Sequence, residues 1–74
     1  MRHESNLIGR KVAKLRYMKG WSQDTLVAKL QVLQCSITRD ILANIETQRS
    51  VATSNHCFFL AKVLGVSIDE LFRP

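Results

Sequence analysis

One pattern recurs along this chain: an apolar residue, then a serine or threonine, then a second apolar residue four positions after the hydroxyl residue. Serine and threonine favour the position before a helix because their side-chain oxygen accepts a hydrogen bond from an unpaired backbone N–H of the first turn. The flanking apolar pair packs together as a hydrophobic staple. Three such helix starts within 74 residues predict a chain of short helices: Trp21-Ser22-Leu26, Ile37-Thr38-Leu42 and Val66-Ser67-Leu71.

A first helix is predicted ahead of these starts. Ile8, Val12 and Leu15 recur at the spacing of one helix face. The helix therefore covers about 6–19, and Gly20 follows as the left-handed residue that commonly ends a helix.

The second helix, which Ser22 caps, is expected to be extended, because Leu33 continues the apolar stripe of Leu26 and Leu30. The third helix begins after Thr38 and carries its own apolar face. That face consists of Ile41, Leu42 and Ile45.

The remaining helix signals lie near the C-terminal end. Thr53 is placed to cap a fourth helix that Gly65 ends, and Ser67 with Glu70 has the spacing of a capping box. We therefore predict an all-α fold of five short helices, with one domain over 6–72 and an N-terminal tail at 1–5.

The charge balance bears on the partner. Eleven Lys and Arg against six Asp and Glu give a net charge of +5, which favours a polyanionic partner, either nucleic acid or an acidic membrane surface. No apolar run approaches the ~18 residues of a membrane span, and the first residues lack the apolar core of a signal peptide. A soluble, cytoplasmic protein without a cofactor is expected.

The second and third helices together, over about 22–46, form the pair with the most functional content. Two short helices joined by a brief connection can cross steeply, so that one lies over the DNA backbone while the other enters the major groove. The third helix, over 38–46, has outward residues suited to base edges: Arg pairs with guanine, Asn with adenine, Asp with the cytosine amino group, and Ala with a thymine methyl. These are Arg39, Asp40, Ala43 and Asn44. An exposed helix face of this composition is also compatible with simple solvation.

Four stretches resemble the phage-repressor-like (Cro/C1 or XRE type) helix-turn-helix family of transcriptional regulators: residues 8–16, 20–26, 37–46 and 60–72. The resemblance implies the lambda-repressor-like fold, with the third helix as recognition helix and Arg39, Asp40, Ala43 and Asn44 as base-reading residues. It also implies phosphate contacts. These fall on Arg10, Gln23, Thr47, Gln48 and Arg49.

The resemblance further implies a structural ion pair between Arg16 and Glu46. Two departures accompany it. Six residues, 31–36, separate Leu30 from Ile37, where the family turns almost directly through a glycine, and Gln48 stands where the family favours glycine after the third helix.

Other constellations are less informative. His3, Cys35, His56 and Cys57 lack the spacing of a zinc site, so no metal is expected and the thiols are taken as reduced and structural. No glycine-rich phosphate loop, paired carboxylates or catalytic triad points to an enzyme. The C-terminal apolar residues either fill the core or form a homodimer interface that spaces two recognition helices by about 34 Å. They are Phe58, Phe59, Val63, Ile68, Leu71 and Phe72.

The sequence therefore predicts sequence-specific binding of double-stranded DNA by a small regulator, as a repressor or autoregulated controller. An antitoxin-like or accessory module that binds another protein, with DNA secondary, is the main alternative. A basic membrane-surface protein is the third, although the apolar stripe of the first helix is needed for the core.

Overall fold

The computed structural model describes the backbone of residues 4–73 and the side chains of residues 8–73. This part of the chain forms five helices and no strand, which confirms the predicted all-helical fold. The helices are α1 (Glu4–Met18), α2 (Gln23–Val32), α3 (Arg39–Glu46), α4 (Ser54–Leu64) and α5 (Ile68–Leu71). Helix α1 begins at Glu4 and not at about position 6, and residues 1–3 of the predicted tail lie outside the described residues.

All four predicted N-caps are present. In each case the hydroxyl oxygen accepts a hydrogen bond, 3.1 Å long, from the backbone N–H three residues later. The caps are Ser22, Thr38, Thr53 and Ser67.

The capping box is not where the sequence placed it. A capping box forms at Thr53 instead. There the side chain of the third helical residue accepts a bond from the cap, since the backbone N–H of Thr53 donates to Nδ1 of His56 at 3.4 Å. The Glu70 carboxylate is instead held by Nζ of Lys11 at 2.9 Å, because α5 packs beside α1 and brings that cation within reach. This pairing lowers the pKa of Glu70 through its hydrogen bond and the charge of Lys11.

The first four helices end in the same way. Each is followed by a residue with positive φ, and the next N–H bonds back into the last turn, as Trp21 N to Arg16 O at 3.1 Å after α1. Glycine takes the left-handed position after α1 and α4, whereas glutamine takes it after α2 and α3. The residues are Gly20, Gln34, Gln48 and Gly65, with φ of 73°, 66°, 63° and 76°.

This ending explains the long connection between α2 and α3. Helix α2 stops at Val32 with Leu33 as its half-buried C-cap, so the predicted extension is one residue too long. Gln34 then reverses the chain: its N–H donates to Gln31 O at 2.8 Å, and the N–H of Cys35 donates to Leu30 O at 3.1 Å.

Replacing Gln34 by glycine should stabilise the protein. A residue with a Cβ pays about 1–2 kcal/mol in the left-handed region, and the extra freedom of glycine in the unfolded chain offsets part of that gain. We expect Gln34→Gly to raise the free energy of unfolding by about 0.5–1 kcal/mol, measured by urea unfolding. Ala28→Gly, at an exposed position inside α2, is the control and should lower it by about 1 kcal/mol. An unchanged or lower midpoint for Gln34→Gly would show that the turn is not strained.

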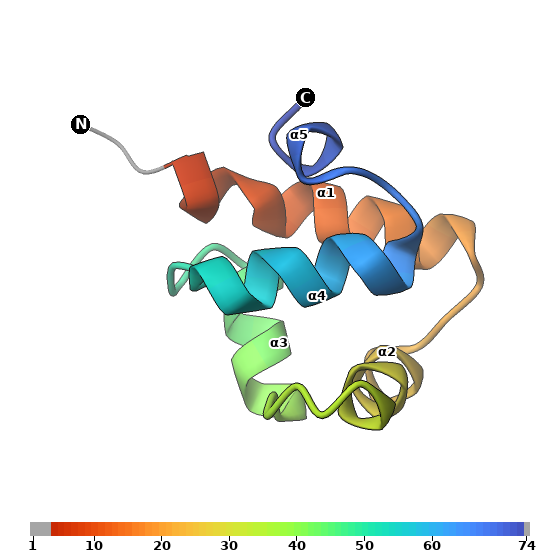
Figure 1. Cartoon of the computed structure of the whole chain (residues 1–74). Coiled ribbons are helices and arrows are strands. Elements are labelled where there is room, and N and C mark those ends of the chain that lie inside the picture. Colours follow the sequence, from red (N-terminus) through yellow and green to blue (C-terminus); the bar gives the residue numbers. More distant parts are fainter. Residues whose placement is uncertain (1–3, 74) are drawn as a thin grey trace.

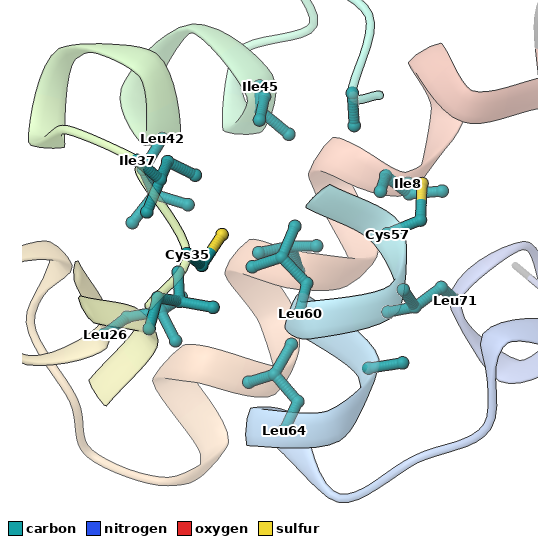
Figure 2. Close-up of a cluster of buried hydrophobic side chains, with 14 of the residues drawn as sticks. Ile8, Leu26, Cys35, Ile37, Leu42, Ile45, Cys57, Leu60, Leu64 and Leu71 are labelled. Atoms are coloured by element: carbon teal, nitrogen blue, oxygen red, sulfur yellow. The ribbon is translucent and has the colours of Figure 1, made fainter. Parts of the chain in front are cut away.

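Helix α4 packs against α1, α2 and α5, while α3 packs against α1 and α2. In Figure 1, α4 lies alongside α1, with α5 on one side of this pair and α2 and α3 on the other. Helix α2 is seen end-on while α3 lies in the plane of the picture, so their axes cross steeply. Figure 2 shows Leu60 of α4 near the centre of the core, with Ile37 and Leu42 on one side and Ile8 and Cys57 on the other.

Candidate nucleic-acid interface

Helix α3 has one buried and one exposed face. Leu42 and Ile45 are almost fully buried, and Glu46 is also buried. The opposite face carries the predicted base-reading residues: Arg39, Asp40 and Asn44 are exposed, and the small Ala43 is half-buried among them. The polar edge of α3 therefore faces solvent and is not covered by another helix.

The position of α3 depends on a close contact with α1. A Cβ built on Gly9 would collide with the carbonyl oxygen of Ile45 and would lie 3.0 Å from its carbonyl carbon and 3.2 Å from Cα of Glu46. Only glycine lets the two backbones approach this closely. The sequence reasoning missed Gly9, although a glycine inside a helical stripe, where it costs about 1 kcal/mol relative to alanine, is a signal of close approach.

A buried ion pair joins α1 to the end of α3. Nε of Arg16 donates to Oε2 of Glu46 at 2.8 Å, and Nη2 donates to Oε1 at 2.9 Å. The remaining guanidinium nitrogen, Nη1, donates to the carbonyl oxygen of Trp21 at 2.8 Å. The hydrogen bonds with Glu46 raise the pKa of the Arg16 guanidinium, against the opposing effect of burial. The fork-shaped geometry fixes the direction of both side chains.

Gln23 extends this network to the start of α2. Its Nε2 donates to Oε1 of Glu46 at 3.0 Å, so the side-chain amide group expected at a DNA phosphate is held by the ion pair. The network therefore links the last turn of α1, through Arg16, to the end of α3, through Glu46, and to the start of α2, through Gln23.

Arg39 is the base-reading candidate with a neighbouring acid. Its Nε lies 3.7 Å from Oδ1 of Asp24, and both side chains are largely exposed, at 66% and 73%. A surface pair of this kind contributes about 0–1 kcal/mol, so Arg39 is free to exchange Asp24 for another acceptor. Arg39 and Gln23 line one side of a hollow of about 360 Å³, with Tyr17 of α1 on another side. The sequence reasoning missed both Asp24 and Tyr17, because only the folded chain brings them beside α3.

The other phosphate candidates lie near the end of α3. Arg10 and Arg49 are exposed, and Arg10 lines a groove together with Gln48. Thr47 differs from the expectation: its hydroxyl donates to the carbonyl oxygen of Ala43 at 2.9 Å, within its own helix end. The fold thus brings Arg10 and Gln48 together, whereas the hydroxyl proton of Thr47 is used within the helix.

The cysteines lie in the core. Cys35 and Cys57 are free and buried, and burial raises the pKa of each thiol. Within the described part of the chain, no three His, Cys, Asp or Glu side chains gather as metal ligands. His3 lies outside the described residues, and burial lowers the pKa of His56. None of the helices over residues 4–73 combines the length and apolar character of a membrane span.

The C-terminal apolar residues divide between core and surface. Leu71, expected as a possible interface residue, is only 1% exposed and belongs to the core, and Phe59 and Val63 pack against that core. Phe58, Ile68 and Phe72 remain exposed at 50%, 41% and 36%.

No family model, curated protein or solved structure matches this chain. What the protein does is therefore inferred from its own residues.

Proposed function

We propose that this chain is a small helix-turn-helix regulator of the phage-repressor-like type that binds double-stranded DNA in a sequence-specific manner. Helix α3 enters the major groove, and Arg39, Asp40, Ala43 and Asn44 face the base edges. The net charge of +5 supplies the attraction to the phosphate backbone.

The observation that carries this proposal is the exposed polar edge of α3 on a rigidly held helix. Side chains that read bases have to project from a backbone whose position is fixed to within a fraction of an ångström. The Gly9 contact and the Arg16–Glu46 pair hold α3 from behind, while Arg39 and Asn44 stay exposed. Because the Gln23 amide and the Thr47 hydroxyl bond within the protein, the exposed Arg10 and Arg49 are the phosphate contacts that we favour.

The proposal predicts a selective loss of affinity in Asn44→Ala. The preferred duplex is first selected from random DNA, and binding is then measured by fluorescence anisotropy between about 50 and 200 mM salt. Loss of a bidentate base contact costs about 1–3 kcal/mol, so we expect Asn44→Ala or Arg39→Ala to weaken binding to the selected duplex by about tenfold or more. Binding to random duplex should change little.

Two further variants sharpen this test. Asn55→Ala removes an exposed asparagine from α4 and should leave binding unchanged. Asp24→Asn removes the carboxylate beside Arg39 and should tighten binding, most clearly at low salt. If no duplex is selected, or if Asn44→Ala and Asn55→Ala behave alike, α3 is not a recognition helix.

We infer that the chain acts as a homodimer on DNA. Phe58 on α4 and Ile68 on α5 are exposed apolar side chains, so a second copy can cover them without blocking the recognition helix. Sedimentation equilibrium would show a dimer that Phe58→Ser weakens. A monomer at every concentration, with and without DNA, contradicts this inference.

The same exposed apolar side chains favour one other function, an antitoxin-like or accessory module that holds a different protein. In that case DNA binding would be weak and indifferent to sequence, and neither Asn44→Ala nor Arg39→Ala would change it. The salt and sequence dependence measured above therefore separates the two functions.

A further inference from the structure

A groove of about 580 Å³ lies between α1, α5 and the turn after α3, away from the polar edge of α3. Its exposed apolar side chain is Phe72, which is 36% exposed, whereas the neighbouring Leu71 is almost fully buried. The volume falls within the range of sites that hold small organic molecules, which combine apolar walls with a few charged or polar groups.

The rim of this groove is strongly basic. Arg10, Lys11, Lys14 and Arg73 all line it. Lys11 is already committed, because its Nζ bonds to Glu70 at 2.9 Å and its side chain is only 11% exposed. Arg73 lies at 4.0 Å from the same carboxylate.

Arg10 and Lys14 are different. Both are exposed, and no carboxylate in the described part of the chain pairs with either of them. Two uncompensated cations above an apolar floor complement one kind of occupant, a molecule with a negative head and a flat or branched apolar body.

We propose that this groove binds a small organic anion, namely a carboxylate carried on an apolar body. The carboxylate lies between Arg10 and Lys14, and the apolar body packs on Phe72. The charged rim favours the anion over neutral and cationic molecules of the same shape, since only the anion forms ion pairs with the two cations.

This site and its test are independent of DNA binding. One consequence rests on the proposed function: Arg10 lines the groove and is also a predicted phosphate contact, so an occupant would compete with the DNA backbone for it. The groove then provides a point at which a small anion weakens DNA binding.

The test is a titration of the full chain, labelled with ¹⁵N, with 2-naphthoate, followed by backbone amide shifts. For a ligand of this size we expect saturable binding with a Kd on the order of 1 mM. The shifts should cluster on the amides of Lys14, Phe72 and Arg73. The neutral analogue 2-naphthalenemethanol should bind at least fivefold more weakly.

Charge variants assign the site. Lys14→Gln should weaken 2-naphthoate binding by up to about fivefold, and Lys14→Gln with Arg10→Gln by about tenfold. The matched control replaces two exposed lysines outside the groove, Lys29→Gln with Lys62→Gln, and should leave the Kd unchanged. Phe72→Ala should weaken 2-naphthoate binding without altering the preference for the anion.

Three results would overturn the proposal. The first is amide shifts scattered over the basic surface. The second is that both double variants weaken 2-naphthoate binding equally. The third is amide shifts near Phe72 that depend on protein concentration but not on 2-naphthoate. The last would assign the groove to a second copy of the chain. Failure of the chain to bind DNA would leave these NMR results unaffected, so the two proposals stand or fall separately.

Discussion

Gly9→Ala should destabilise the protein, although alanine is the better helix former by about 1 kcal/mol. The added methyl group meets the backbone of α3 at Ile45 and Glu46, and backbone atoms inside a packed helix pair cannot move aside as a flexible side chain can. Overpacking of this kind costs about 1–3 kcal/mol. We expect the upper end of that range, about 3 kcal/mol net, and a fall in Tm of about 12–24 °C by thermal unfolding.

The control for Gly9→Ala measures helix propensity in the same protein. Ala28 is exposed on α2, so Ala28→Gly should cost about 1 kcal/mol through propensity alone. If Gly9→Ala instead raises Tm, α1 and α3 do not approach as closely as the structure has them. A partly folded Gly9→Ala protein should also bind the selected DNA less tightly, since α3 would be displaced from α1.

Glu46→Leu should be at least as damaging at the α1–α3 contact as Gly9→Ala. It leaves the Arg16 guanidinium buried without its two carboxylate bonds, and an uncompensated buried charge costs about 3–5 kcal/mol. Small domains commonly have a free energy of unfolding of about 5–15 kcal/mol, so this loss is a large share of the total. Urea unfolding of Glu46→Leu should show the loss directly.

The double variant Arg16→Met with Glu46→Leu should recover most of that loss. Buried ion pairs add little net stability, because desolvation of both charges offsets their attraction, and apolar replacements of similar volume are often neutral. We expect the double variant to lie within about 2 kcal/mol of the parent protein, with clear non-additivity of the single changes. Asp24→Asn, which breaks the exposed pair with Arg39, should cost less than about 1 kcal/mol. Additive losses in the double variant would show that packing and not charge pairing dominates at this position.

Contacts within one helical turn were predictable from the sequence, whereas several contacts between helices were not. The helix starts were predictable, because a cap joins residues only three positions apart and needs no other part of the chain: Ser22, Thr38, Thr53 and Ser67 all act as predicted. The capping box at Glu70 was wrong for the opposite reason. Its carboxylate is taken by Lys11, 59 positions away, once α5 packs against α1.

The candidate site shows the same division. Residue type and helical spacing identified the outward edge of α3, where Arg39, Asp40 and Asn44 are exposed. The pairing of Arg16 with Glu46 came from the family resemblance and not from spacing. The engagement of Gln23 with Glu46 was not foreseen, because it depends on how α2 is docked.

The sequence by itself determined where the helices begin, which of their faces are apolar, and the overall positive charge. These follow from interactions within one or two helical turns and from counting ionisable side chains. Only the tertiary structure decided that Gly9 admits the backbone of α3 and that a groove lies beside Phe72. It also decided that Lys11 pairs with Glu70, whereas no carboxylate among the side chains of residues 8–73 pairs with Arg10 or Lys14. Such features depend on the angles and distances between helices, which packing of the whole core sets and no local pattern encodes.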